Sequence, residues 1–329
     1  MKVQQIIGAD LSKKSIDLVC HHTKNHLKID NTPAGFKRLL KWFSQQKMNI
    51  ADMMIVMEHT GFCSYRFEQF LLHHSICFTK ISALAIKRSM GLVRGKSDKI
   101  DAARIACYGF EKKDKLIANV PVDRDIQRLQ MLQATRGRLV KQRTGLKCAV
   151  KEYRYIGMSQ KDIIMESQLK LIKNFDNQIQ KLEQEIKIVV EQQKSLNDNF
   201  NLLVSTKGVG KVLALATIVK THNFKRFMDP RKFACFCGTA PFEYTSGTSI
   251  RGRTKVNHLA DKQMKTLLDL SAKSAIQYDK ELRLFYLKRL EKGKSKMSTI
   301  NIVRNKILYR MFAVIKRQTP FIENYLQAA

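Results

Sequence analysis

Residues 3–21, VQQIIGADLSKKSIDLVCH, decide the fold of the first part of this chain. Apolar residues dominate 3–9 and 15–21, and a short polar connection separates them, so the pattern predicts two successive strands. A third short strand is expected at 26–30, after another polar connection. Asp10 lies where the first strand ends, which places a carboxylate at the border of an apolar segment.

Helices and strands alternate beyond these three strands. The amphipathic stretch 33–46 predicts a helix, the apolar run MMIVM at 53–57 a buried strand, 65–73 a helix and 76–81 a strand. A further helix is expected to begin near Asp98, after the turn Gly-Lys-Ser. This order predicts an α/β unit with a mixed, mostly buried sheet flanked by helices.

The middle of the chain carries heptad repeats. Apolar residues recur every seven positions within 123–157, and a cleaner heptad follows at 172–196. The pattern predicts two antiparallel helices or a self-associating coiled coil. We expect three domains: a metal-binding unit at 1–121, a helical coiled-coil and oligomerisation region at 122–200, and a mostly helical domain at 201–329.

Composition narrows the class of protein. The chain has 329 residues, 44% of them hydrophobic, and 60 Lys plus Arg against 28 Asp plus Glu give a net charge of +32. Such a balance indicates nucleic acid as the first partner and an anionic membrane surface as the second. No apolar run of about 18 residues and no secretory signal is visible, so we expect a soluble, cytoplasmic protein without a membrane partner.

The cysteines predict no special chemistry. Seven occur, an odd number scattered mostly through apolar segments, which fits reduced thiols better than a disulfide framework. Cys235 and Cys237 form a lone C-x-C without a second pair. We expect core residues there rather than a zinc site.

Four carboxylates are candidate metal ligands. Asp10 and Glu58 each follow an apolar strand, and they emerge at the same edge if those strands are neighbours. Asp98 and Asp101 share one face of a helix start. Together they could hold two Mg²⁺ ions, or Mn²⁺, about 3.5–4 Å apart for phosphodiester chemistry. Taken singly, Asp98 and Asp101 are explained by helix capping and Asp10 by a turn. A charged Glu58 directly after the apolar strand MMIVM costs free energy unless it has a function, which favours metal binding.

A glycine turn precedes an apolar helix in the C-terminal part, which also holds the most basic long stretch. Lys207, Gly208, Gly210 and Lys211 resemble the turn of a helix-hairpin-helix, in which backbone N–H groups at a helix start approach a phosphate. A plain helix-to-helix turn that needs positive φ explains the glycines equally well.

The stretch 238–253 is rich in hydroxyl groups and ends with Arg251 and Arg253, which are candidates to clamp phosphates. A hydroxyl nucleophile needs exposure, a base or metal, and nearby cations. The chemistry leaves four candidates open, namely Thr245, Ser246, Thr248 and Ser249. The alternative is a polar loop that contacts phosphate without covalent chemistry.

The ordered motifs resemble those of the DEDD transposases of the one-ten family of insertion sequences, which are similar to Piv-type DNA invertases. The resemblance covers nearly the whole chain. Its motifs are G-A-D-L-S-K-K-S-I-D around Asp10, M-E-H-T-G around Glu58, G-K-S-D-K-I-D-A at 95–102, G-V-G-K at 208–211, F-x-x-F-x-G-x-x-P at 233–241, S-G at 246–247 and N-x-V-R-x-K at 301–306. Thr239-Ala240 departs from the usual pattern and affects no catalytic assignment.

The resemblance implies a fold and a reaction. The first unit is expected to be RuvC-like, of the ribonuclease-H type, with the four acids as metal ligands, and Ser246 falls on the family's catalytic serine. The family cuts DNA through a covalent phosphoserine link that leaves a free 3′ hydroxyl, and then exchanges strands through a junction. A structured non-coding RNA selects target and donor DNA. Dimers and tetramers bring the acidic domain of one protomer to the serine domain of another.

Three other functions compete with an RNA-guided recombinase. The first is a RuvC-like junction nuclease that uses water, with Ser246 only a phosphate contact. The second is an actin-like sugar kinase or ATPase, because the motif around Asp10 resembles the phosphate-binding hairpin of that superfamily; the strong basic charge and the hydroxyl-rich stretch argue against it. The third is a non-catalytic nucleic-acid-binding protein.

Overall fold

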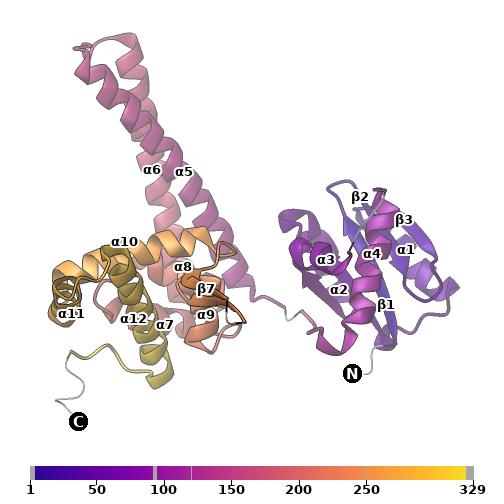
Figure 1. Ribbon diagram of the computed structural model, residues 1–329. Coiled ribbons are helices and arrows are strands. Elements are labelled where there is room, and N and C mark those ends of the chain that lie inside the picture. The colour runs from indigo at the N-terminus through magenta and orange to yellow at the C-terminus, as the bar shows by residue number, and fades with distance from the viewer. Residues whose placement is uncertain (1–3, 92–94, 120, 248, 324–329) are drawn as a thin grey trace. The chain divides into compact units, whose positions relative to one another are not determined.

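The computed structural model describes residues 4–91, 95–119, 121–247 and 249–323 (Figure 1). Thr248, one of the candidate hydroxyls, lies outside these residues. The chain divides into two compact units, residues 1–121 and 122–329. No helix within the described ranges is long and apolar enough to span a membrane.

The first unit is built on a five-stranded mixed sheet with the strand order β3-β2-β1-β4-β5. The strands are β1 (Gln5–Leu11), β2 (Ser15–Cys20), β3 (His26–Asp30), β4 (Met53–Glu58) and β5 (Phe78–Ile81). The first three pair antiparallel, whereas β4 runs parallel to both β1 and β5. The predicted mixed sheet is therefore confirmed, and β1 extends past its predicted end to include Asp10.

Helices cover both faces of this sheet. They are α1 (Pro33–Gln45), α2 (Tyr65–His73), α3 (Ala83–Ser89) and α4 (Asp98–Glu111), with short 3-10 turns at Ile50–Asp52, Gly61–Ser64 and Lys113–Lys115. Phe36 and Phe67 of α1 and α2 join the core on one face, while Ile86 and Ile105 of α3 and α4 join Val56 on the other. Burial on both faces accounts for the unbroken apolar run in β4.

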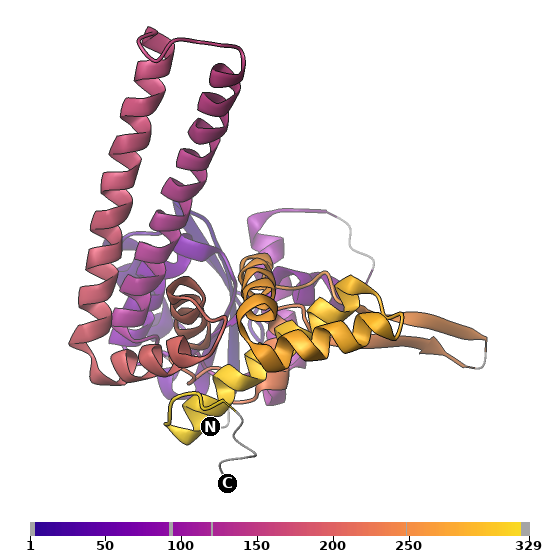
Figure 2. The same ribbon diagram turned by 90° about the vertical axis from the view of Figure 1, so that its left-hand side faces the viewer.

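The second unit begins with a long helical hairpin. Helices α5 (Arg124–Tyr155) and α6 (Ile163–Gln192) lie side by side in Figures 1 and 2. Ion pairs link them along their length, with Arg128 to Glu185 at 3.0 Å near one end and Arg143 to Asp176 at 2.5 Å further along. The order of these pairs makes the helices antiparallel, so within one chain the heptad stretches are partners of each other.

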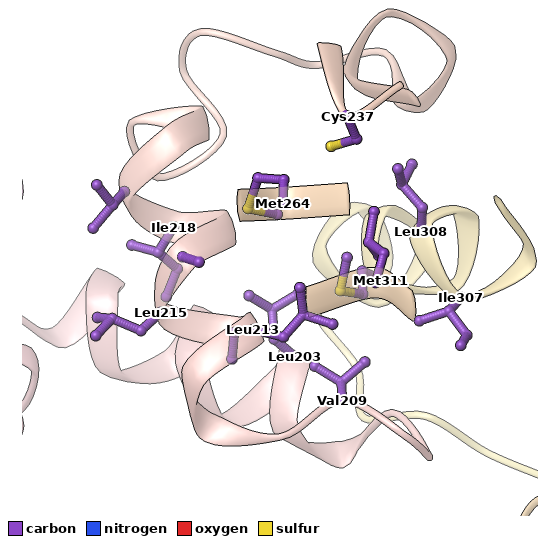
Figure 3. Close-up of a cluster of buried hydrophobic side chains, with 14 of the residues drawn as sticks. Leu203, Val209, Leu213, Leu215, Ile218, Cys237, Met264, Ile307, Leu308 and Met311 are labelled. Atoms are coloured by element: carbon purple, nitrogen blue, oxygen red, sulfur yellow. The ribbon is translucent and has the colours of Figure 1, made fainter. Parts of the chain in front are cut away.

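The remaining helices pack into one core together with the base of that hairpin. They are α7 (Lys194–Ser205), α8 (Lys211–Thr221), α9 (Pro230–Phe236), α10 (Lys262–Tyr278), α11 (Lys280–Glu291) and α12 (Lys296–Arg317). Figure 3 shows Leu203, Met264 and Met311 of this core, with Cys237 beside them. Leu129 of α5 belongs to the same cluster. The predicted mostly helical character of this part is confirmed.

A two-stranded ribbon extends from these helices, as Figure 2 shows. Strand β6 (Pro241–Ser246) pairs antiparallel with β7 (Ile250–Val256), with an irregularity between Phe242 and Tyr244. All six residues of β6 are exposed. Most of the hydroxyl-rich stretch at 238–253 therefore belongs to a β-hairpin, which the sequence did not predict because β6 buries no residue.

Candidate functional site

Asp10 and Glu58 lie at corresponding positions of neighbouring strands. In the parallel register of β1 and β4, Ala9 is opposite Met57, and the two acids are the next residues along each strand. Both are partly buried, next to strand residues that are fully buried. The sheet therefore presents the two carboxylates at one edge.

Helix α4 brings the other two acids to this edge. Its approach depends on Gly8, because a Cβ built there would lie 2.1 Å from the carbonyl oxygen of Ala102 and 2.3 Å from the backbone nitrogen of Ala106. The glycine thus lets the helix backbone rest directly on β1. Asp98 and Asp101 occupy the first turn of α4.

The electrostatics show that the other three carboxylates act on Asp10 and that Asp101 acts on Glu58. The pKa of Asp10 is raised to about 6, first by burial and then by the negative charges of Asp98, Asp101 and Glu58. Burial also raises the pKa of Glu58, with a further contribution from Asp101. Mutual repulsion among carboxylates is the expected consequence of gathering them without a compensating cation.

Basic side chains contact two of the acids. Nη1 of Arg104 donates to Oδ1 of Asp101 at 2.8 Å, and Nζ of Lys28 lies 3.8 Å from a carboxylate oxygen of Asp98. In the part of the chain that the structure describes, no three His, Cys, Asp or Glu side chains converge as metal ligands. The donor set still fits a hard divalent cation, since all its ligand atoms are oxygens and a cation would relieve the repulsion on Asp10.

A fifth carboxylate, which the sequence did not single out, lies beside the four. Asp17 of β2 is the cross-strand partner of Asp10 and is only 4% exposed. Nε2 of His26 lies 2.7 Å from one of its oxygens and Nζ of Lys28 lies 3.5 Å from the other, so Lys28 stands between Asp17 and Asp98. Its signal was an acid inside the apolar strand SIDLVC, a pattern like that of Glu58.

The three candidate hydroxyls that the structure describes lie at or beside the tip of the ribbon. Ser246 is the last residue of β6, is exposed and pairs with Ile250. Thr245 is exposed and faces Arg251 across the ribbon, and Ser249 is exposed in the turn. The backbone of Arg253 lies in β7, but its side chain is outside the description.

The root of the ribbon is anchored by α12. The Nδ2 groups of Asn301 and Asn305 donate to the carbonyl oxygen of Thr239 at 2.8 and 2.9 Å. The Thr239 hydroxyl donates to Oδ1 of Asn305 at 2.7 Å, and Thr239 is fully buried two residues before β6. Arg304 between them pairs with Asp269. The motif N-x-V-R-x-K thus has a positioning role, and Asn305 at a variable position of the motif was missed.

The glycine turn between α7 and α8 packs against α10. Gly208 has a φ of +86°, and a Cβ there would lie 2.8 Å from the Cβ of Ala275. The hydroxyl of Ser271 donates to the carbonyl oxygen of Gly208 at 2.6 Å. Helix packing therefore accounts for this glycine without a phosphate.

The other candidate residues of that turn are fully or partly exposed. Gly210 is the N-cap of α8 and supplies no side-chain cap to its N–H groups. Lys211 is exposed, whereas Lys207 pairs with Glu323. The start of α8 therefore keeps the features that a phosphate contact needs, and the contact itself stays a prediction.

Comparison with known proteins identifies the family. A model for DEDD transposases of the IS110 type matches residues 7–153, and a model for the transposase IS116/IS110/IS902 family matches residues 200–287. The chain belongs to the IS110 family of transposases. Pilin gene-inverting proteins of Moraxella bovis and Moraxella lacunata are each 25% identical to this transposase in an alignment of 327 residues that covers 96% of this chain and 97% of each relative.

Membership of this family makes the chain a DNA transposase or recombinase. Asp10, Glu58, Asp98 and Asp101 of this transposase all fall within the first matched segment, and Ser246 falls within the second. The two candidate centres therefore belong to the two matched parts of the transposase.

Proposed function

We propose that this transposase cuts DNA by attack of Ser246 on a phosphodiester, with the four carboxylates as ligands of two Mg²⁺ ions, or of Mn²⁺. The observation that carries the proposal is geometric: Asp10 and Glu58 occupy corresponding positions of neighbouring parallel strands, and the first turn of α4 carries Asp98 and Asp101. Burial, and then the charges of these neighbours, raise the pKa of Asp10 in agreement with this arrangement. Gathered carboxylates at the end of parallel strands suit a cation and a polyanionic substrate. We also assign this unit the RuvC-like arrangement that the resemblance to the family implies, and the mixed sheet with the order β3-β2-β1-β4-β5 supports the assignment.

The chemical step is a transfer of a phosphoryl group. The bond between Ser246 Oγ and phosphorus forms while the bond from phosphorus to O3′ breaks. The 5′ phosphate then stays on the serine, and O3′ leaves as a free hydroxyl. Exposure at the ribbon tip suits this role because the phosphate must reach Oγ from outside the chain. Arg251, next to the tip on β7, supplies positive charge for the phosphate oxygens.

The acidic residues have the role of holding and orienting the divalent cation. A divalent cation bound by them supplies Lewis-acid stabilisation of charge on the phosphate. Gly8 sets the distance of α4 from β1 and thereby positions Asp98 and Asp101 against Asp10. Lys28, which also contacts Asp17, supplies positive charge beside Asp98.

Assembly completes the proposed site. The acids belong to one compact unit and Ser246 to the other. The resemblance to the family implies a dimer or tetramer in which the acidic unit of one protomer serves the serine of another, followed by strand exchange through a junction, and the proposal adopts this arrangement. A structured non-coding RNA selects target and donor DNA in this proposal, and the net charge of +32 supports binding of both nucleic acids.

The decisive test is a covalent adduct. The full-length protein is incubated with Mg²⁺ and a plasmid that carries the gene with its flanking DNA, after co-expression from that DNA so that any flanking RNA is present. A denaturing gel should show protein attached to a 5′ end. Ser246→Ala should abolish the adduct, and the matched variant Ser249→Ala in the same turn should retain it.

Two results would redirect the assignment. Cleaved DNA without attached protein would favour the water-using junction nuclease. An adduct that persists in Ser246→Ala and disappears in Ser249→Ala would move the nucleophile within the turn. RNA guidance is tested separately, because ribonuclease treatment before the DNA is added should remove cleavage, while an unaffected reaction would exclude a guide.

A further inference from the structure

Two aromatic side chains on the ribbon are largely exposed to solvent. Phe242 is 47% exposed and Tyr244 is 69% exposed, on a ribbon of only two strands. A lone hairpin is marginally stable, and exposed aromatic rings add little to its stability. Both rings are therefore open to contact with a partner.

Tyr244 is held in a defined orientation. It pairs with Gly252 across the ribbon, and a Cβ built on that glycine would lie 2.8 Å from Cδ1 of the tyrosine and 3.4 Å from its Cβ. The ring therefore lies over the glycine and rests against the backbone of β7. Because Gly252 has no side chain, the ring keeps this position, and most of it stays open to solvent.

Tyr244 and Ser246 point to the same face of the ribbon. Side chains alternate along a strand, and the pairing from Tyr244 to Ser246 is regular. Two residues of a strand span about 6.8 Å. Stacked nucleotides in one strand are about 3.4 Å apart, so the ring stands about two nucleotides from a phosphate bound at Ser246.

The charge of the ribbon identifies its partner class. The ribbon has three basic residues, Arg251, Arg253 and Lys255, and one acidic residue, Glu243. Among the ribbon side chains that the structure describes, none forms a hydrogen bond or ion pair with the rest of the chain. A positive ribbon with an open, oriented ring and unpaired hydroxyl groups suits a nucleic acid strand better than an apolar protein surface.

We propose that Tyr244 stacks on an unpaired base of the DNA strand within about two nucleotides of the phosphate that Ser246 attacks. The stacking places that phosphate by fixing the neighbouring base. This inference rests on the proposed role of Ser246, but the binding of the base itself does not need the hydroxyl of Ser246.

The first test measures affinity of the full-length protein for a short, labelled, mixed-sequence single-stranded DNA by fluorescence anisotropy. Tyr244→Ala should raise the Kd about 5- to 150-fold, whereas Tyr244→Phe should stay close to the wild type. The matched control is Tyr278→Ala, because Tyr278 is 73% exposed at the end of α10 in the same unit. Its replacement should leave the Kd unchanged.

A second measurement follows the ring directly. The chain has a single tryptophan, Trp42, which is buried in the first unit. Tyr244→Trp adds an exposed indole at the ribbon, and single-stranded DNA should quench its fluorescence. The same DNA should leave the fluorescence of Tyr278→Trp unchanged.

Four outcomes would overturn the proposal. They are an unchanged Kd for Tyr244→Ala, a loss for Tyr244→Phe as large as that for alanine, an equal loss for Tyr278→Ala, and quenching of Tyr244→Trp by RNA of the same sequence but not by DNA. Repeating the binding series in Ser246→Ala separates the two hypotheses. If Tyr244→Ala still raises the Kd in the Ser246→Ala background while the adduct persists, only the serine assignment is wrong. If the adduct is lost in Ser246→Ala but Tyr244→Ala leaves the Kd unchanged, only the stacking is wrong.

Discussion

The acidic edge and the serine ribbon place their functional groups by opposite means. Asp10 and Glu58 end neighbouring strands of a sheet that is packed on both faces, and Gly8 holds α4 directly against it. Ser246 stands at the tip of a ribbon whose strand β6 is wholly exposed and whose root is anchored through Thr239. Packing around the acidic edge fixes the positions of its side chains. The serine ribbon is fixed only at its root, and its tip is exposed to a partner.

This difference has an energetic consequence. Burial and the neighbouring carboxylates both disfavour the charged form of Asp10, as its raised pKa indicates. Gathering the acids therefore lowers the stability of the sheet unit. The exposed serine opposes no packing, and its replacement should leave the fold unchanged. Replacements at the acidic edge should therefore change both stability and chemistry, whereas replacements at the ribbon tip should change chemistry alone.

The largest effect is expected from Glu58→Gln. A cation at the carboxylates provides several kcal/mol of charge stabilisation, so losing one ligand should lower the rate of adduct formation at least about 100-fold. The matched control is Glu243→Gln on the exposed strand β6, which should keep the rate within about 3-fold. The rates of adduct formation are compared on denaturing gels. Equal losses of rate for the two variants would contradict the proposed difference between the acidic edge and the ribbon.

A smaller but broader effect is expected from Gly8→Ala. The added Cβ meets the backbone of Ala102 at 2.1 Å, so α4 must move, at a cost of about 1–3 kcal/mol in the free energy of unfolding. Gly137→Ala in α5 is the control, since a Cβ there meets nothing within 4 Å and should stabilise by about 0.5–1 kcal/mol. Chemical denaturation measures both, and a neutral Gly8→Ala would contradict the close contact.

Asn305→Ala tests the root of the ribbon. It removes one of two donors to the Thr239 carbonyl and the acceptor of its hydroxyl, which should cost about 1–2 kcal/mol of stability. The adduct should also fall, although Ser246 remains. Asn201→Ala on the exposed surface of α7 is the control and should change neither quantity. An adduct that falls equally in both variants would remove the positioning role from Asn305.

The smallest effect concerns pH. Folding raises the pKa of Asp10 from 3.8 to about 6. Between these two pH values, Asp10 is therefore protonated in a larger fraction of folded chains than of unfolded chains. The contribution of Asp10 to stability is therefore present at pH 4 and is lost as the pH rises through 6. Asp10→Asn removes the charge, so in EDTA it should unfold at a higher temperature than the wild type at pH 7.5 and at nearly the same temperature at pH 4.

Magnesium sharpens the same measurement. Added Mg²⁺ should raise the unfolding temperature of the wild type at pH 7.5 more than that of Asp10→Asn, because a bound ligand stabilises the state that binds it. An equal shift in both proteins would argue against the carboxylates as cation ligands.

Much of the sheet unit follows from local patterns. Alternating helix and strand segments predicted a mixed sheet, and the unbroken run MMIVM predicted a strand covered on both faces, as β4 is. The helical part was also predictable from its periodicity. Local patterns failed for the ribbon, because β6 buries no residue and its alternation of aromatic and polar side chains extends over only four residues, 242–245.

Some of the candidate site was beyond local patterns as well. Asp17 becomes part of the acidic edge only through its pairing with Asp10 across two strands. Asn305 matters only because α12 packs on the loop before β6. Gly208 looked like a phosphate-binding glycine, but its contact with α10 provides a packing reason.

The sequence by itself determined which groups are available: the acids at strand ends, the hydroxyls near arginines, and the strong positive charge, because these depend on residue type and short spacing. Only the tertiary structure decided which groups are neighbours. Register placed Asp17 beside Asp10, the absence of a side chain at Gly8 set the position of α4, and α12 fixed the root of the ribbon. Contacts between residues distant in sequence arise from packing, and local periodicity does not encode them.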